Sequence, residues 1–345
     1  MKILIISTSV APLGAKRYGG IELLVSRYLN ALNKRSHEVT VAAPIGSKVP
    51  DGVELIETVA LPEEQDKDDI AFGRYLRQSP AFDVIHDFSH KHVMARNITS
   101  QKNPIVSMIW SPVTYRYEVA PFNIVAISEW QGSRFRELHE QAARVMPSVL
   151  VDCNEYTLKT EKSDRFLFIG KATPEKGAHK AIEYAKALNV PLDLFLGLIP
   201  SDIEANKRYV SLIESQCDGM IKTYYNTYED GAATQEKKIE LLQNARALIY
   251  PVQQDEAHSQ IMVEAMACGT PFITFARGVL PELDFAGALC HSEEGFLQAM
   301  KDETEYPVAF PEECREVALK HYDINTKITE WETLYGQVAD GLRWF

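Results

Sequence analysis

Short apolar runs alternate with amphipathic segments along most of the chain. Residues 21–35 place six apolar side chains on one stripe and so predict a helix whose buried face carries Ile21, Leu24, Val25, Tyr28, Leu29 and Leu32. Apolar runs at residues 1–8 and 39–43 flank this helix and are predicted to be strands. Further strand-like runs in the first half lie at residues 83–86, 104–109 and 124–127. This alternation predicts a parallel sheet covered by helices.

The alternation lapses once and then returns. Residues 146–161 are polar and irregular, and they form the expected linker. Beyond them the pattern predicts strands at 166–170, 192–196, 221–225, 246–252 and 272–275, and helices at 178–188, 236–245 and 260–268. A closing helix from about residue 325 has an apolar face made of Ile328, Trp331, Leu334, Tyr335 and Val338.

We therefore expect an α/β protein with two Rossmann-like doubly wound domains that face each other across a cleft. The first domain spans residues 1–150 and the second spans residues 151–324. The closing helix, residues 325–345, is expected to pack back on the first domain.

The composition fits a globular protein with two cores. The 345 residues exceed the usual size of one hydrophobic core, and 46% are hydrophobic while 24% are charged. No window approaches the ~20 apolar residues of a membrane span, and the apolar start is too short for a signal peptide. Five widely spaced cysteines without a CxxC pair indicate reduced thiols in a cytoplasmic protein.

The net charge of −12 narrows the range of partners. It argues against general nucleic-acid binding and against purely electrostatic docking on anionic lipid. A local basic pocket for one phosphorylated ligand remains compatible with this charge.

The segment at residues 246–275 is the most informative part of the chain. It reads as a strand, a loop, a helix and a second strand, with Gly269 as a left-handed helix cap and Pro271 ending the helix. Glu256 falls on the loop and Glu264, eight positions later, falls inside the helix. Taken alone, the two glutamates could equally be a solvated loop charge and a helix-surface residue.

The start of this helix is a candidate anion site. A helix entered from a strand presents backbone NH groups at the carboxyl edge of the sheet, where open α/β proteins bind phosphates. His258 or Ser259 would lie at the helix start and Gln260 directly follows. Glu256 and Glu264 would then flank the anion and accept hydrogen bonds from sugar hydroxyls.

Other residues could support the same site. Lys171 and Lys176 lie in GKATPEKG, on a strand-to-helix loop that faces the same sheet edge, where two cations would stabilise a departing diphosphate. The alternative is a solvated pair. In the first half, Gly19 and Gly20 directly precede a helix and would let a ligand approach the backbone. The GxGxxG spacing of dinucleotide-binding enzymes is absent, which disfavours a dehydrogenase.

Metal binding is not expected. In HDFSHKH, His86 ends an apolar strand and is a candidate cleft residue, whereas His90 and His92 lie among polar residues and are expected to be solvated. The acidic pair Asp66 and Asp68 follows Pro62 without a preceding strand of useful length. We predict no metal site and no cofactor.

The text EAHSQIMVEAMACGTPFIT closely resembles the donor-site motif of family 4 retaining glycosyltransferases, where a Glu, seven residues and a second Glu run into AMACGTP. GKATPEKG is similar to the family's G-R-x-x-x-x-K-G signature, with Lys171 in place of the Arg. The lysine keeps the positive charge but cannot form the bidentate hydrogen bonds of an arginine. The segments YGGIE, SHEVTV and RGVLPEL also resemble sequences of this family. The similar segments lie in both halves of the chain and are more numerous in the second half.

The resemblance implies a GT-B architecture and a metal-independent, retaining hexosyltransferase. The nucleotide sugar would be a substrate held by the second domain, and the acceptor would belong to the first. Glu264 would hold the ribose hydroxyls, Glu256 the transferred sugar, and Lys171 with Lys176 the diphosphate. Backbone NH groups at residues 258–260 would assist, and Gly19 with Gly20 would close over the phosphates.

Several positions depart from the family. Trp110, with Ser111, stands where the family has a His that contacts the transferred sugar, so Trp110 is a candidate cleft residue. His258 and Ser259 replace the usual Phe and Gly. The resemblance favours UDP-glucose, leaves GDP-mannose open, and assigns neither the acceptor nor an oligomeric state. Two alternatives share the architecture, a nucleotide-sugar epimerase and a non-catalytic nucleotide-sugar binder.

Overall fold

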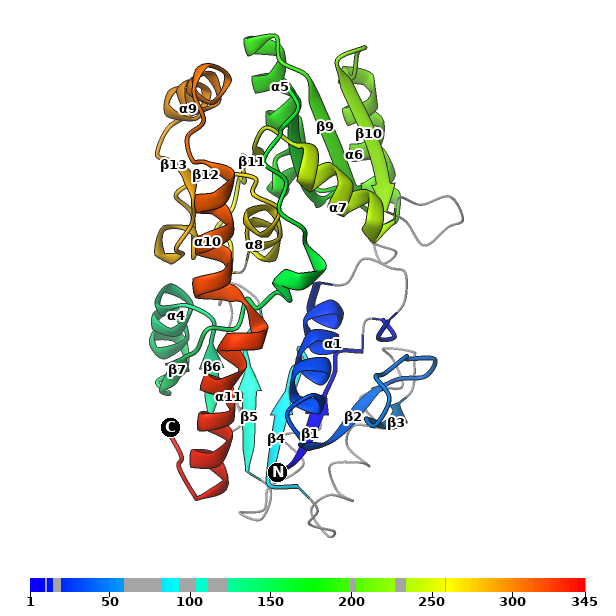
Figure 1. Ribbon diagram of the computed structural model, residues 1–345, viewed down its shortest axis with the longest axis vertical. Helices are drawn as coiled ribbons and strands as arrows, with labels where there is room; N and C mark the ends of the chain where they lie inside the picture. Colours follow the sequence, from blue (N-terminus) through cyan, green and yellow to red (C-terminus); the bar gives the residue numbers. More distant parts are fainter. Residues whose placement is uncertain are drawn as a thin grey trace. The chain divides into compact units, whose positions relative to one another are not determined.

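The computed structural model describes residues 1–9, 11–14, 20–58, 82–92, 104–110, 123–198, 203–226, 234–257 and 259–344. These residues form two compact units (Figure 1). Unit 1 combines the described residues before Val151 with those from Ile324 onward, and unit 2 runs Val151–Asp323. Val151 and Asp323, the two ends of unit 2, form a parallel bridge.

Unit 1 is built on a seven-stranded sheet with the order β3-β2-β1-β4-β5-β6-β7. All its strand pairs are parallel. The strands are β1 (Lys2–Ile6), β2 (Glu38–Pro44), β3 (Glu54–Thr58), β4 (Val84–Asp87), β5 (Ile105–Met108), β6 (Ile124–Ala126) and β7 (Ala143–Val145). The helices among its described residues are α1 (Gly20–Asn33), α4 (Glu129–His139) and α11 (Ile324–Ala339). The chain adds β2 and β3 on one side of β1 and then β4 on the other, so the winding reverses between β1 and β4.

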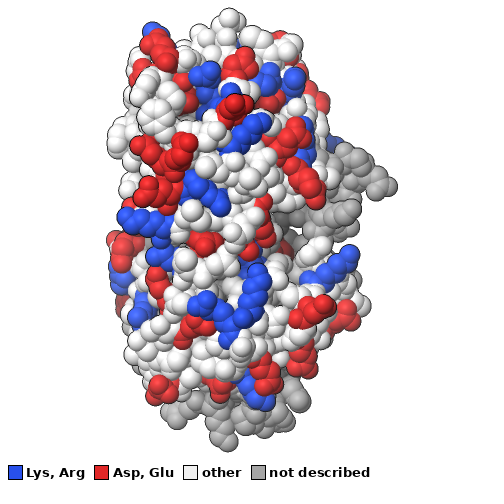
Figure 2. Space-filling model, in the orientation of Figure 1, with Lys and Arg blue, Asp and Glu red and all other residues white. Residues whose placement is uncertain are grey.

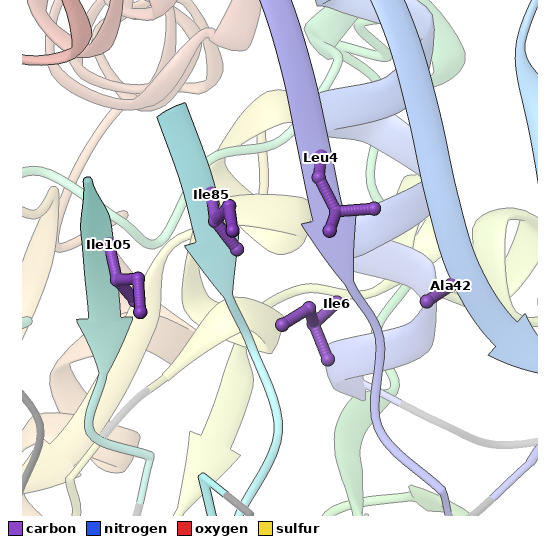
Figure 3. Packing of buried hydrophobic residues seen from close by; sticks show 5 residues of the cluster. All are labelled: Leu4, Ile6, Ala42, Ile85 and Ile105. Carbon is purple, nitrogen blue, oxygen red and sulfur yellow. The ribbon is translucent and has the colours of Figure 1, made fainter. Parts of the chain in front are cut away.

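The core of unit 1 follows from strands that are buried on both faces, as parallel sheets require. One cluster draws apolar side chains from four neighbouring strands, Leu4, Ile6, Ala42, Ile85 and Ile105 (Figure 3). All five are at most 5% exposed. Ile3 and Ile5, which alternate with Leu4 and Ile6 along β1, are also fully buried, so both faces of this strand are shielded from solvent and residues 3–6 are an unbroken apolar run.

The last helix belongs to unit 1, as predicted. In α11 the side chains of Trp331 and Tyr335 are fully buried, and Trp331 Nε1 donates to Pro147 O at 2.9 Å. Trp331 stacks on His86 with ring centroids 4.6 Å apart and meets Tyr28 of α1 edge to face at 5.7 Å. Aromatic pairs in these geometries stabilise beyond their buried area, so α11 is part of the core of unit 1.

Unit 2 has a six-stranded parallel sheet with the order β10-β9-β8-β11-β12-β13. The strands are β8 (Phe166–Lys171), β9 (Leu192–Gly197), β10 (Ile221–Asn226), β11 (Leu248–Tyr250), β12 (Phe272–Phe275) and β13 (Gly287–Cys290). The helices are α5 (Ala178–Leu188), α6 (Ile203–Gln216), α7 (Gln235–Asn244), α8 (Gln260–Ala267), α9 (Glu293–Glu305) and α10 (Pro311–Tyr322). Here the winding reverses between β8 and β11.

The doubly wound α/β fold predicted from the sequence is confirmed, and most predicted elements occur within one or two residues. The strand predicted at 246–252 is shorter, because Val252 N bonds back to Tyr250 O at 2.8 Å and turns the chain after β11. Gly269 has the left-handed backbone predicted for it, with φ +77°. The predicted polar linker contains a buried apolar stretch, Val149, Leu150 and Val151.

Charges of both signs are interspersed on the face of the molecule drawn in Figure 2. Among the described residues, no helix combines the length and the apolar character that crossing a membrane would take. The five cysteines are unpaired thiols, and four of them are buried.

Candidate functional site

The loops that follow β8 and β11 meet at the point where the winding of unit 2 reverses. These strands are neighbours, paired at Leu167 and Leu248, so their carboxyl ends share one edge of the sheet. Lys176 from the first loop and Glu256 from the second form an ion pair of 2.6 Å. The side chains are 18% and 5% exposed, respectively. The sequence predicted both residues for one site, and the structure brings them into contact.

Glycine makes the close approach of these two loops possible. Gly177, directly after Lys176, has φ +85°, and a Cβ there would lie 2.1 Å from Pro251 O. The loops are also joined by a hydrogen bond from Gln253 N to Glu175 O at 2.8 Å. Any larger residue at position 177 would separate the backbones, so this glycine fixes where Lys176 can reach.

The turn after β12 holds the backbone of Glu256. Gly278 has φ +58°, and a Cβ at this position would lie 2.2 Å from Glu256 O. Val279 N donates to that same carbonyl at 2.8 Å, and Gly278 N donates to Asp255 Oδ1 at 3.1 Å. Glu256 is therefore fixed from both sides, by Lys176 at its carboxylate and by the glycine turn at its backbone.

The second predicted carboxylate has a partner that sequence reasoning missed. Glu264 Oε2 lies 2.7 Å from Lys238 Nζ of α7, and Gln260 Nε2 donates to Glu264 Oε1 at 3.3 Å. The Lys238 and Glu264 side chains are 11% and 3% exposed. Lys238 shares the buried side of α7 with Leu241 and Leu242. A lysine on an apolar helix face was the available signal for a buried partner.

The start of α8 offers hydrogen-bond donors beside these carboxylates. Ser259 is its N-cap and is 3% exposed, but the hydroxyl makes no cap hydrogen bond. Ser259 Oγ has no hydrogen-bond partner within the described part of the chain. His258 lies outside the described residues. An unpaired buried hydroxyl is costly without a ligand, and it adjoins the positive end of the helix dipole.

The remaining predicted donor residues differ in how far the structure describes them. Lys171 is the last residue of β8 and is exposed at the same carboxyl edge as the loop of Lys176. Gly20 begins α1 in unit 1 and is exposed. Gly19 lies outside the described residues, so the predicted glycine pair is described in part only.

Two expectations for the histidines of unit 1 are wrong. His86 does not line an open cleft, because it is fully buried beneath α11, where Nδ1 lies 2.6 Å from the Tyr335 hydroxyl and burial lowers its pKa well below the usual range. His92 is not a solvated residue, since it is 6% exposed and contacts Asp87. His90 is exposed.

Trp110 follows β5 and is half-buried. Its Nε1 donates to Phe88 O at 2.9 Å, and the two rings stack with centroids 5.6 Å apart. Among the residues that the structure describes, no three His, Cys, Asp or Glu side chains gather as metal ligands. Asp66 and Asp68 lie outside those residues.

The arrangement in unit 2 has a definite chemical character. Two buried carboxylates can accept hydrogen bonds from neutral hydroxyls, and the lysines and the start of α8 can stabilise negative phosphate oxygens. Each carboxylate is held by one lysine at 2.6 or 2.7 Å. Such a set suits a ligand that combines sugar hydroxyls with a diphosphate.

Comparison with known proteins agrees with this chemistry. Residues 226–306, which include both carboxylates, match the family model described as glycosyl transferases group 1. No curated protein sequence matches the chain.

Solved structures match nearly the whole chain. AviGT4, a glycosyltransferase involved in avilamycin A biosynthesis, superposes with a TM-score of 0.76 at 21% identity over 100% of both chains. Sucrose-phosphate synthase from Thermosynechococcus elongatus gives 0.78 at 16% identity, over 99% of this chain and 100% of that one. Alr3699/HepE of Anabaena, solved with UDP-glucose, gives 0.69 at 16% identity over 97% and 100%. The chain thus has the GT-B fold of these glycosyltransferases, and its carboxylate segment matches the group 1 model.

Proposed function

We propose that the protein is a retaining glycosyltransferase that transfers a hexose from a nucleoside-diphosphate sugar to a hydroxyl acceptor, with UDP-glucose as the first donor to test. The observation that carries this proposal is the Lys176–Glu256 pair of 2.6 Å at the reversal point of unit 2, next to the start of α8. The group 1 match and the resemblance to family 4 support it.

Each group in unit 2 has a role in this proposal. Glu264, oriented by Lys238 and Gln260, accepts hydrogen bonds from the ribose hydroxyls. Glu256 accepts hydrogen bonds from the hydroxyls of the transferred sugar. Lys176 and Lys171 neutralise the diphosphate, and the backbone NH groups at the start of α8 add to this charge stabilisation.

The chemistry follows from charge that develops as the sugar leaves. When the bond from the anomeric carbon to the diphosphate breaks, negative charge grows on the diphosphate oxygens. Lysines and helix NH groups that are already in place stabilise this charge without reorganising, which is the largest single contribution in many enzymes. We infer that these groups perform the task without a metal ion, and that the acceptor attacks on the leaving-group face.

The first experiment is a thermal-shift screen of nucleotide sugars with UDP-glucose, GDP-mannose and UDP-N-acetylglucosamine. A ligand at 100 times its dissociation constant adds about 2.7 kcal/mol to the stability of the folded state. Product analysis with the stabilising compound then separates the reaction classes. A released nucleoside diphosphate with transferred or hydrolysed sugar supports a transferase, whereas an epimerised nucleotide sugar would contradict it and support the nucleotide-sugar epimerase.

The roles of the pair are tested by substitution. Glu256→Ala and Lys176→Ala should each abolish turnover while the protein remains folded by circular dichroism. Unchanged turnover in either variant would remove that residue from the proposed site. Lys180→Ala is the matched control, because Lys180 makes surface ion pairs with Glu183 and Glu293 in the same unit.

A further inference from the structure

The carboxyl edge of the sheet in unit 1 holds a buried carboxylate and imidazole that the proposed donor site does not use. Asp87 is the last residue of β4 and has no solvent exposure. Its Oδ2 lies 2.8 Å from His92 Nδ1, and its Oδ1 accepts a hydrogen bond from Ser89 N at 2.8 Å. A carboxylate that accepts a hydrogen bond from the imidazole holds the ring proton on Nδ1 and leaves Nε2 as an acceptor.

The backbone of this loop is shaped to make the contact. His92 has φ +52°, a left-handed conformation that residues other than glycine rarely adopt. Its NH donates to Ser89 Oγ at 3.2 Å, which helps to close the loop back on Asp87. Strained conformations of this kind persist where the surrounding structure enforces them, and they concentrate at functional sites.

The described residues next to the pair include buried hydroxyls and the buried carboxylate of Glu22. β4 pairs with β1 in a register that sets Asp87 opposite Ile6, so Ser7 and Thr8 come next along the neighbouring strand. Ser7 Oγ is buried and has no hydrogen-bond partner among the residues that the structure describes. Thr8 donates to the buried carboxylate of Glu22. Hydroxyl, carboxylate and imidazole groups are those that recognise a neutral compound rich in hydroxyls.

The position of the pair in the sheet is also informative. The winding of unit 1 reverses between β1 and β4, and open α/β sheets bind ligands outside the carboxyl ends of the strands at such a point. Asp87, His92, Ser7 and Thr8 all lie at this edge. In unit 2 the corresponding point carries the proposed donor site.

We propose that His92 binds the attacking hydroxyl of the acceptor and that Asp87 is its positioning residue, an inference that rests on the proposed glycosyltransferase function. His92 Nε2 accepts the hydrogen bond of the acceptor hydroxyl and takes up its proton as the acceptor oxygen bonds to the anomeric carbon and the bond from that carbon to the departing diphosphate breaks. Asp87 keeps the proton on Nδ1 and fixes the ring. The acceptor class is a neutral polyhydroxylated compound such as a sugar.

The test uses hydrolysis of the nucleotide sugar, in which water is the simplest hydroxyl acceptor. UDP-glucose, GDP-mannose and UDP-N-acetylglucosamine are the probes. His92→Phe and Asp87→Asn should lower the hydrolysis rate about tenfold or more, whereas the dissociation constant of the nucleotide sugar by calorimetry should not change. His90→Gln, an exposed histidine two residues away, should keep the wild-type rate.

A second measurement needs no variant. Nitrogen-15 spectra of the wild-type protein at pH 8.5, where imidazoles are generally neutral, should assign the His92 proton to Nδ1. A proton on Nε2, or a wild-type hydrolysis rate in folded His92→Phe, would overturn the assignment of His92 alone. A wild-type protein that neither binds nor hydrolyses the three nucleotide sugars would overturn the proposed function and this inference with it.

Discussion

The two reversal points of the molecule have the same topology and different chemistry. In unit 2 the loops after β8 and β11 bring Lys176 and Glu256 together at 2.6 Å, and Lys238 of α7 lies 2.7 Å from Glu264 of α8. In unit 1 the loop after β4 pairs Asp87 with His92, and the neighbouring groups are hydroxyls. Because the sheets are alike, the difference lies in the loops. In the functions proposed for the two units, ligands bind at equivalent points of the fold, and the side chains there suit an anionic ligand in unit 2 and a neutral one in unit 1.

The largest expected effect comes from breaking the Lys176 pair. Lys176→Met removes the cation at the diphosphate and leaves the buried Glu256 carboxylate unpaired. We expect a loss of about 10³-fold in kcat/KM and of roughly 3 kcal/mol in the free energy of unfolding. Steady-state kinetics and urea denaturation measure the two quantities.

A double variant separates the two losses. Lys176→Met with Glu256→Gln removes the unpaired charge, so the double variant should regain most of the stability and none of the activity. If the activity returned with the stability, the Lys176–Glu256 pair would have a structural role only. The proposed difference in ligand chemistry between unit 2 and unit 1 would then be contradicted.

Lys238 should produce a smaller effect that is confined to nucleotide binding. Lys238→Met leaves Glu264, which is 2% exposed, without its cation, and we expect nucleotide affinity to fall about tenfold to 100-fold, since each tenfold corresponds to 1.4 kcal/mol. Lys238→Arg keeps a charged donor and should recover part of the affinity. Calorimetry with UDP and with UDP-glucose is the measurement, and equal affinities in wild type and Lys238→Met would contradict the positioning role.

The response of stability to pH should distinguish the two units. Burial lowers the pKa of His86 in unit 1 well below its usual range, so only the unfolded state takes up that proton as the pH falls below about 6.5. Stability from this group is therefore present above pH 6.5 and lost on acidification, by up to ~1.4 kcal/mol per pH unit. His86→Leu should flatten this decline between pH 6.5 and 5.5 in urea titrations.

Unit 2 contains a group with the opposite effect of pH on stability. Burial raises the pKa of Glu303 to about 7, against a hydrogen bond from Val308 N that lowers it. The folded state then retains a proton that the unfolded state has released, so stability is lost as the pH rises from about 4.5 to 7. Glu303→Gln should therefore gain stability relative to wild type above pH 7. A wild-type pH profile of stability in this variant would contradict the opposite pH dependence expected for the two units.

The smallest effect is expected at the start of α8. Replacing an N-cap serine by alanine usually costs about 1 kcal/mol, and Ser292→Ala should do so, because Ser292 Oγ accepts a hydrogen bond from Gly295 N at 3.1 Å. Ser259 Oγ has no such partner among the described residues. Ser259→Ala should keep the melting temperature and weaken nucleotide-sugar affinity a few-fold, whereas a drop in melting temperature like that of Ser292→Ala would assign the hydroxyl to the fold.

The sequence predicted local patterns well and long-range pairs poorly. Apolar periodicity located the helix Ala178–Leu188 and the strand Phe272–Phe275 at their observed bounds. A buried helix face or central strand requires apolar residues at regular positions, so the pattern is visible in the sequence itself. Glu256 and Lys176 were predicted for one site because both follow strands. The Lys238–Glu264 pair joins residues 26 positions apart, and no local pattern encodes which buried lysine reaches which carboxylate.

His86 and His92 show the same limit in unit 1. Their positions near the end of an apolar strand do not reveal that one is covered by Trp331, more than 200 residues later, and that the other folds back on Asp87 through a left-handed turn. The covering helix was itself predicted, but the side chains beneath it depend on how it packs. Tertiary contacts decide these outcomes.

The return of α11 to unit 1 has a consequence for how the protein is made. Unit 2 is continuous from Val151 to Asp323, so it can complete its sheet while the ribosome is still adding residues. Unit 1, although its sheet is synthesised first, keeps Tyr28 and His86 uncovered until Trp331 and Tyr335 have emerged. The half of the molecule that is translated first is therefore the half that finishes folding last, and a ribosome stalled before α11 would hold a chain with an open aromatic core.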